Sequence, residues 1–412
     1  MTRITATLPL LWLPLAFGAV DSSCKFDYVT FSSGFEGARL SACRRLDKSS
    51  YELLIKPESA PINNSPWYAF RLDIEEGVPL RSLTLSLRYD DGSHRYQPKM
   101  LRHTDGRKSI WQALTNKQPE SGSNGHSLSF ELTPESHSLT ISAQPLLTNA
   151  DHHAFVQTMA EHADARLEVI GNSVEGRSIE ALWIGQADPA RPTVVLLGRQ
   201  HPPEVPGALA LQAFLREILA DTERARSFRT MFQVLAIPNL NPDGVAHGHW
   251  RLNANHVDLN RDWGPFTQPA TTTVGDLLKD LGSPRANGGL WLLLDFHSTR
   301  RDLFFTQREP PELDLPAFTR CWLDRVDQAL PDYKVARAPR HLAEGTTAKA
   351  WTTRLLRAPA VTYEVGDATS PDTLARVART AAVKLMHTLL QAHGQLLAPC
   401  HSACSPCVVP TD

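Results

Sequence analysis

Residues 194–204 read VVLLGRQHPPE, an apolar run followed directly by a polar turn. The apolar run up to Gly198 predicts a buried strand. After Glu204, apolar residues recur at helical spacing from Ala208 to Leu219, which predicts a helix. His201 and Glu204 therefore lie on the turn at the carboxyl end of a strand, where open α/β sheets usually bind ligands. An imidazole and a carboxylate three residues apart can bind one zinc ion, although solvated loop residues often show the same spacing.

The composition is typical of a folded chain with more than one domain. The 412 residues are enough for two or three domains, and 42% of them are hydrophobic, which provides for a sizeable core. The formal net charge of -2 argues against non-specific nucleic-acid binding. No window of about 18 uncharged apolar residues occurs in the body of the chain, so no transmembrane helix is predicted there.

The N-terminus is typical of a secretory signal. Arg3 provides a positive start, the segment from Leu8 to Val20 is apolar, and Ala16-Phe17-Gly18 offers small residues for cleavage. We therefore predict a signal peptide over residues 1–20. The protein is then periplasmic or secreted, or cytoplasmic if this segment is not cleaved.

The six cysteines suit an exported protein with disulfides, because their number is even, but their pairing cannot be deduced. They are Cys24, Cys43, Cys321, Cys400, Cys404 and Cys407. The last three fall in a tail, residues 396–412, where a disulfide or reducible thiols are favoured over a metal site.

Two domains are predicted from the change in pattern along the chain. Residues 24–147 contain short alternating strands separated by turns, which predicts an all-β sandwich. After a polar connection from Leu147 to Phe155, residues 148–395 alternate helical segments with apolar strands, which predicts an α/β domain with a mostly parallel mixed sheet. The expected strands are 51–55, 67–72, 80–87, 127–132 and 138–141, then 193–198, 231–238, 290–297 and 360–365. A final helix is expected to begin near Ser370.

Polar groups follow the predicted strands of the second domain. They are His201 with Glu204; Asn241-Pro242-Asp243-Gly244, which leads to Arg251 and to Asp258-Leu259-Asn260-Arg261; Asp295-Phe296-His297; and Tyr363-Glu364. Two histidines and one glutamate can form a three-ligand zinc site with a fourth position for water. A further carboxylate can accept the proton of that water, and guanidinium groups can bind a carboxylate or a developing oxyanion.

With these motifs in this order, the segment from about Ser173 to Gly394 resembles the zinc metallocarboxypeptidases of the carboxypeptidase A clan. The signature of that family is His-x-x-Glu, Asn-Pro-Asp-Gly, an Arg, Asn-Arg, a second His and a late Glu, and all of them occur here. The preceding domain, with its segments 34–37 and 67–71, is similar to the domain ahead of the catalytic one in the cytosolic-carboxypeptidase branch. The resemblance implies hydrolysis of a C-terminal peptide bond in a peptide or protein substrate.

The resemblance implies that His201, Glu204 and His297 bind one zinc ion per chain. It places Asp258 beside a ligand imidazole, where an accepted hydrogen bond fixes the tautomer.

The same resemblance implies roles for four more residues. Asn260 and Arg261 would hold the terminal carboxylate of the substrate, for which a bidentate arginine is suited. Arg251 would polarise the scissile carbonyl and stabilise the tetrahedral oxyanion. Glu364 would act as general base and then as general acid toward the leaving amine, without a covalent intermediate.

Substrate preference is predicted from cations near the site. Lys349 lies in the segment that selects the side chain in the family, so it would favour an acidic C-terminal residue. Arg300 and Arg301, just after His297, offer the same charge, and solvated loop cations are the alternative for all three.

One feature of the family has no clear counterpart. Many members place a tyrosine roughly 20 residues before the catalytic glutamate, where His341 and Leu342 occur in this chain; Tyr333 is the nearest upstream tyrosine. The role is therefore left unassigned.

Two other functions are compatible with the same motifs. One is a zinc amidase that acts on murein peptides or N-acyl amino acids. The other is an inactive module that only binds peptides.

Overall fold

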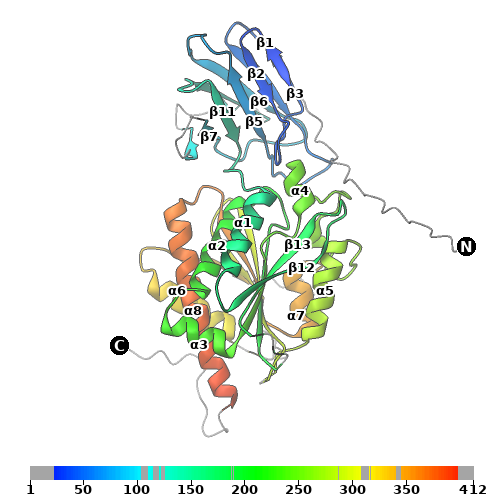
Figure 1. The fold of residues 1–412 in the computed structure, drawn as a ribbon, viewed down its shortest axis with the longest axis vertical. Coiled ribbons are helices and arrows are strands. Elements are labelled where there is room, and N and C mark those ends of the chain that lie inside the picture. The colour runs from blue at the N-terminus through cyan, green and yellow to red at the C-terminus, as the bar shows by residue number, and fades with distance from the viewer. Residues whose placement is uncertain are drawn as a thin grey trace, which may run out of the picture.

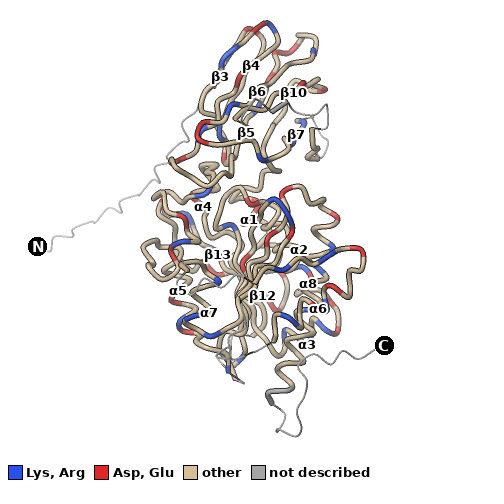
Figure 2. The backbone as a smooth tube through the Cα atoms, turned by 180° about the vertical axis from the view of Figure 1, so that it is seen from behind, with Lys and Arg blue, Asp and Glu red and all other residues tan. Residues whose placement is uncertain are grey.

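The computed structural model describes residues 23–103, 110–114, 120–121, 126–186, 188, 190–285, 287–307, 315, 317–339 and 345–397. The predicted signal peptide (residues 1–20) and residues 398–412 of the predicted tail lie outside the described residues. Figure 1 shows two parts stacked along the long axis, a β region (residues 24–142) and an α/β region (residues 149–397). Seen from behind in Figure 2, basic and acidic residues are interspersed along both parts. Among the described helices, none is both long and apolar enough to span a membrane.

The β region is the predicted sandwich, in which two sheets share one hydrophobic core. Alternation along the strands builds this core: in β6 (Leu83–Tyr89) every second side chain, starting with Leu83, is buried. A disulfide between Cys24 and Cys43 joins the two sheets. The first sheet has the order β1 (Cys24–Phe26), β2 (Val29–Ser32), β5 (Ala69–Ile74), β11 (Ser138–Ser142), β7 (Lys99–Arg102) and β8 (Gln112–Ala113). The second has the order β3 (Ala42–Arg45), β4 (Ser50–Ile55), β6, β10 (Ser127–Leu132) and β9 (Glu120–Ser121).

The α/β region contains an eight-stranded mixed sheet, as predicted. Its order is β12 (Ala165–Asn172), β13 (Ser178–Ile184), β15 (Gln233–Ile237), β14 (Thr193–Gly198), β16 (Leu290–Thr299), β19 (Ala360–Gly366), β17 (Leu303–Thr306) and β18 (Arg337–Pro339). The four central strands, β15, β14, β16 and β19, are mutually parallel. These four are the strands predicted from the apolar runs, which are continuous because both faces of a central parallel strand are buried.

Helices cover both faces of the sheet (Figure 1). One face carries α1 (Asn149–Ala160), α2 (Val205–Ile218), α3 (Glu223–Met231), α6 (Phe318–Ala329) and α8 (Pro371–Leu397). The other carries α5 (Pro269–Leu281) and α7 (Ala348–Leu356). The short α4 (Pro242–His247) lies at the end of the sheet that faces the β region.

The predicted polar connection from Leu147 to Phe155 is wrong, because α1 begins within it at Asn149. Thr148 and Asp151 form a capping box, in which each side chain accepts a hydrogen bond from the backbone N–H of the other residue. The helix then buries Phe155 and Val156 against the sheet. Its polar exposed face accounts for the misleading composition.

Candidate metal centre

His201 and Glu204 lie on the turn between β14 and α2. The turn starts at Arg199, whose φ of 52° is in the left-handed region, and ends at Glu204, which occupies the N-cap position of α2. The two side chains are buried and meet directly, with 2.9 Å between His201 Nδ1 and Glu204 Oε1. The strand–turn–helix pattern expected from the sequence therefore brings both donors to one point.

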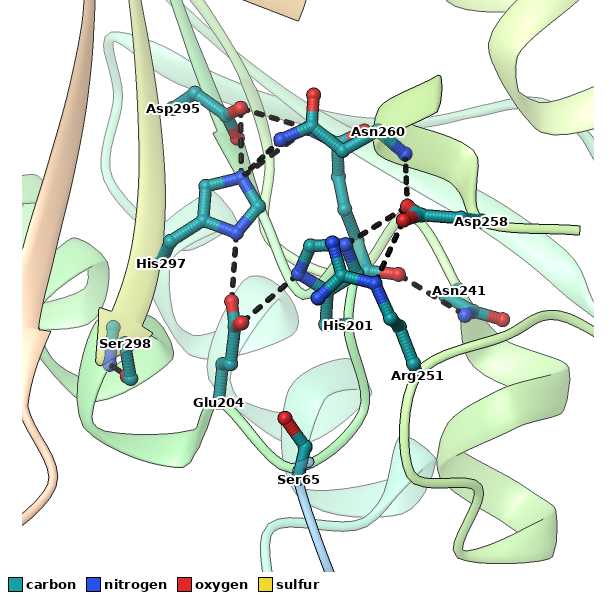
Figure 3. A network of polar contacts seen from close by, with 12 residues as sticks. Ser65, His201, Glu204, Asn241, Arg251, Asp258, Asn260, Asp295, His297 and Ser298 are labelled. Carbon is teal, nitrogen blue, oxygen red and sulfur yellow. Dashed lines mark hydrogen bonds and ion pairs between the residues drawn. The ribbon is translucent and has the colours of Figure 1, made fainter. Parts of the chain in front are cut away.

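His297 reaches the same point from β16. Its Nδ1 atom lies 2.6 Å from Glu204 Oε2, so the carboxylate lies between the two imidazoles (Figure 3). Gly207 permits this approach, because a Cβ atom there would lie 2.5 Å from the carbonyl oxygen of His297. One donor atom from each of His201, Glu204 and His297 lies within 4.8 Å of the others, and all three residues are buried.

Each imidazole has a second carboxylate on its far side. His201 Nε2 is 3.0 Å from Asp258 Oδ1, and His297 Nε2 is 2.8 Å from Asp295 Oδ2. Each imidazole thus lies between two carboxylates, with Nε2 facing the outer one and Nδ1 facing Glu204 at the centre. This arrangement fixes imidazole orientation in metal sites, and a buried set of two nitrogens and one carboxylate is a donor set that suits zinc.

The charges of this cluster depend on one another. Burial opposes ionisation of His297, but the carboxylates of Asp295 and Glu204 outweigh it and raise the pKa of this imidazole well above its usual value. Burial also opposes the Glu204 carboxylate, yet the two histidines lower its pKa well below the usual range. The site therefore favours the ionised form of Glu204 next to a positive charge. Protonated imidazoles or a bound cation can provide that charge.

From the sequence, Asp295 was quoted among the polar groups but given no role, and Gln200 was not singled out. Asp295 is fully buried on β16, two residues before His297, and Gln200 Nε2 donates to its Oδ2 atom over 2.8 Å. Trp263 Nε1 in turn donates to Gln200 Oε1 over 2.9 Å. Residues two apart on a strand share a face, so the spacing of Asp295 and His297 was a usable signal.

Arg251 and Asp258 form an ion pair beside His201. Arg251 Nε donates to Asp258 Oδ2 over 2.7 Å, so Asp258 links the guanidinium to the imidazole (Figure 3). Burial opposes ionisation of Asp258, but His201 and then Arg251 outweigh it and lower the pKa of this carboxyl. Asp258 is thus held as an anion between two donors.

Asn260 and Arg261 lie on the short helical turn Leu259–Arg261, beside His297. The Asn260 side chain accepts a hydrogen bond from the N–H of Ala348 over 3.0 Å and places Nδ2 3.2 Å from His297 Nε2. Arg261 NH1 donates to the Asn260 carbonyl over 2.7 Å.

Glu364 lies on β19, directly beside His297 in the parallel register with β16. Its Oε2 atom is buried and has no hydrogen-bond partner among the described residues. Burial, reinforced by the nearby Glu204 carboxylate, outweighs the two histidines and raises its pKa to about 7. A carboxyl group with a pKa near neutrality can both accept and return a proton.

These residues surround a cleft of about 270 Å³ between the two regions. From the α/β region it is lined by His201, Glu204, Arg251, Asn260, Arg261, His297, Lys349 and Glu364, among others. From the β region Asn63, Ser65 and Arg95 contribute.

The predicted specificity cations differ in position. Lys349 lines the cleft, is 8% exposed, and donates from Nζ to the Thr306 carbonyl over 3.3 Å. Arg300 and Arg301 are exposed and do not line the cleft. His341 and Leu342, at the position of the family tyrosine, lie outside the described residues.

Comparison with known sequences identifies relatives of the α/β region. The family model described as zinc carboxypeptidase matches residues 152–280. Mouse cytosolic carboxypeptidase 6 is 24% identical over 305 residues, which cover 68% of this chain and 55% of that protein. Zebrafish cytosolic carboxypeptidase-like protein 5 is 44% identical over 66 residues, which cover 16% of this chain and 8% of that protein. The chain thus spans little more than half of the first of these relatives and a small part of the second.

Solved structures share the fold of both regions. A metallo-carboxypeptidase from Burkholderia cenocepacia has a TM-score of 0.73 at 17% identity, covering 90% of this chain and 100% of that one. A metallo-carboxypeptidase from Pseudomonas aeruginosa, solved in complex with (2-guanidinoethylmercapto)succinic acid, has a TM-score of 0.69 at 19% identity, covering 88% and 99%. Residues 152–280 thus match the zinc carboxypeptidase family, and both regions share the fold of these two metallo-carboxypeptidases.

Proposed function

We propose that this chain is a zinc-dependent carboxypeptidase that hydrolyses the C-terminal peptide bond of a peptide or protein. The observation that carries the proposal is the convergence of His201, Glu204 and His297 beside the buried carboxyl of Glu364. A structural ion-pair cluster would not require a further carboxyl with an unpartnered oxygen at its edge.

His201 and His297 would hold the ion through the Nδ1 atoms that face Glu204, and Glu204 would hold it through its carboxylate. When bound, zinc acts as a Lewis acid that polarises the scissile carbonyl and makes water more acidic. Asp258 and Asp295 hold the two imidazoles in the orientation that this binding requires.

Glu364 accepts a proton from water as the water oxygen bonds to the carbonyl carbon. Arg251 stabilises the negative charge that develops on the carbonyl oxygen. Glu364 then delivers the proton to the amine nitrogen as the carbon–nitrogen bond breaks. Asn260 and Arg261 bind the terminal carboxylate of the substrate and so restrict cleavage to the last peptide bond.

We further propose a preference for acidic C-terminal side chains, because Lys349 places a cation in the wall of the cleft. Lys349→Met should lower kcat/KM for a peptide ending in glutamate by about tenfold relative to one ending in leucine, since a partly buried charge pair contributes roughly 1–2 kcal/mol. Arg300→Met is the matched control, because Arg300 is exposed and does not line the cleft. An unchanged glutamate-to-leucine ratio in Lys349→Met contradicts this preference.

The disulfide between Cys24 and Cys43 supports the further proposal that the chain is exported after removal of residues 1–20. N-terminal sequencing of the mature protein tests this. A mature chain that retains Met1 contradicts it.

The direct test of the proposed function is digestion of a peptide library with the zinc-loaded protein, read by mass spectrometry with and without a chelator. We expect loss of single C-terminal residues that stops when the metal is removed. Cleavage of diaminopimelate-containing muropeptides in place of ordinary peptides would indicate an amidase. Stoichiometric zinc without turnover on either substrate would indicate a binding module.

A further inference from the structure

Glu58 of the β region caps a loop of the α/β region. It lies in the connection between β4 and β5, and its carboxylate accepts three backbone hydrogen bonds. The N–H of Trp250 donates to Oε2 over 2.7 Å, while the N–H groups of Arg251 and Leu252 donate to Oε1, each over 2.8 Å. One carboxylate therefore binds three consecutive peptide groups centred on Arg251.

The loop that carries Arg251 lacks regular secondary structure. Between α4 and the short helical turn at Leu259–Arg261, the chain forms neither a helix nor a strand, so no backbone ladder fixes its position. Hydrogen bonds from backbone N–H groups to an anion are short and strong, and here three of them hold the loop together with those from Asn241 and His249 to the Leu252 carbonyl.

Trp250 anchors the same loop by packing. Its side chain is fully buried, and it belongs to the hydrophobic core of the β region. The contact with Gly92 is so close that a Cβ atom there would lie 2.7 Å from the indole ring. The loop is thus attached to the β region by the buried Trp250 ring and by the Glu58 carboxylate.

The guanidinium of Arg251 leaves this anchored backbone toward the candidate metal centre. Its Nε atom donates to Asp258, which accepts from His201, and Arg251 lines the cleft. The side chain is 11% exposed and its Nε atom is bound to Asp258, so the guanidinium has little freedom to move independently of its backbone. A displacement of the backbone at Arg251 would therefore move the guanidinium relative to the cleft.

We propose that Glu58 is a positioning residue for Arg251, through which the β region takes part in the reaction of the α/β region. This inference rests on the proposed carboxypeptidase function. Glu58 itself does not line the cleft. It acts by holding the loop so that Arg251 meets the carbonyl oxygen on which charge develops.

A double-mutant cycle in the zinc-loaded chain, with both regions present, tests the proposal with a glutamate-ending peptide as substrate. Loss of an oxyanion donor typically lowers kcat by roughly 10²–10³, so we expect Glu58→Ala, which only loosens that donor, to lower kcat by about tenfold or more with little change in KM. In an Arg251→Ala background, Glu58→Ala should lower kcat by less than about threefold, since residues that act through one another are not additive. Glu76→Gln, a change on a side chain that is 89% exposed in the same region, is the matched control.

Equal losses from Glu58→Ala in the presence and absence of Arg251 would overturn the proposal and indicate a general structural role. If Glu58→Ala does not fold, Glu58→Gln replaces it, because the amide keeps one acceptor oxygen and loses the other. We then expect a kcat loss of about threefold or more that again disappears in Arg251→Ala, and an unchanged kcat would overturn the proposal. An inactive wild-type protein would instead refute the carboxypeptidase function itself, which separates the two failures.

Discussion

Replacement of Glu364 by glutamine is expected to make the metal-free protein more stable and the zinc-loaded protein much less active. Burial raises the pKa of Glu364 from 4.5 to about 7, so the folded protein prefers the protonated carboxyl. Between these two pH values the unfolded chain loses the proton while the folded chain keeps it. The free energy of unfolding of the wild type must therefore fall as pH rises through this window, since folding stability decreases wherever the folded state binds more protons.

The magnitude follows from the size of the shift. A difference of about 2.5 pH units corresponds to ~3 kcal/mol at ~1.4 kcal/mol per unit. Glutamine carries no charge at any pH and does not incur this loss. We compare the free energies of unfolding of metal-free Glu364→Gln and metal-free wild type. The difference in favour of the variant should be up to ~3 kcal/mol larger at pH 8 than at pH 4.5.

Urea unfolding in the presence of a chelator, at both pH values, measures this difference. Glu76→Gln serves as the control, because its exposed side chain should show no such pH-dependent gain. Zinc-loaded Glu364→Gln should also retain one metal ion per chain while its kcat falls by roughly 10²–10⁴, the usual contribution of a general base. A stability difference that is the same at both pH values, or a kcat close to that of wild type, would refute the reasoning.

Three further predictions follow from the same contacts. Asp295→Asn and Asp258→Asn should each weaken zinc affinity by about 10–100-fold, because each replaces the charged acceptor that orients one imidazole by a weaker, neutral one. Competition with a chromophoric chelator measures the affinity, and an unchanged value would contradict that role. Arg95 binds the Asp367 carboxylate at 2.8 Å, and that carboxylate is only about 10% exposed. Arg95→Ala leaves this buried charge without its partner, so it should lower the free energy of unfolding by ~3–5 kcal/mol in urea titrations. A loss below ~1 kcal/mol would contradict this. The kcat/KM of the wild type should rise with pH through the pKa of Glu364, because only the ionised carboxyl accepts a proton. This pKa is about 7 in the metal-free protein, and the charge of the metal lowers it. A kcat/KM that falls over pH 5–7 would contradict the role of Glu364 as general base.

The sequence was most informative about the central sheet. Apolar runs identified β14, β15, β16 and β19, because strands buried on both faces are apolar over most of their length. The mixed edges were harder to predict: β12 alternates poorly and carries an irregularity between Val169 and Gly171, so its pattern resembles neither a regular strand nor a helix. Helix α1 was missed although its capping residues, Thr148 and Asp151, were visible in the sequence.

The residues of the candidate site also differ in whether the sequence predicted them. His201, Glu204 and His297 could be located because each directly follows or ends a recognisable strand. Glu58 and Arg95 could not, since the contact of Glu58 with Arg251 spans 193 residues and that of Arg95 with Asp367 spans 272. Contacts between the two regions depend on how the regions pack, and no local periodicity encodes that packing.

Diffraction from zinc-loaded crystals at the zinc absorption edge would locate the metal ion. We expect one strong anomalous peak about 2.0–2.2 Å from His201 Nδ1, His297 Nδ1 and an oxygen of Glu204. A peak at a different cluster of side chains, or none at this site in a protein that removes C-terminal residues, would contradict it.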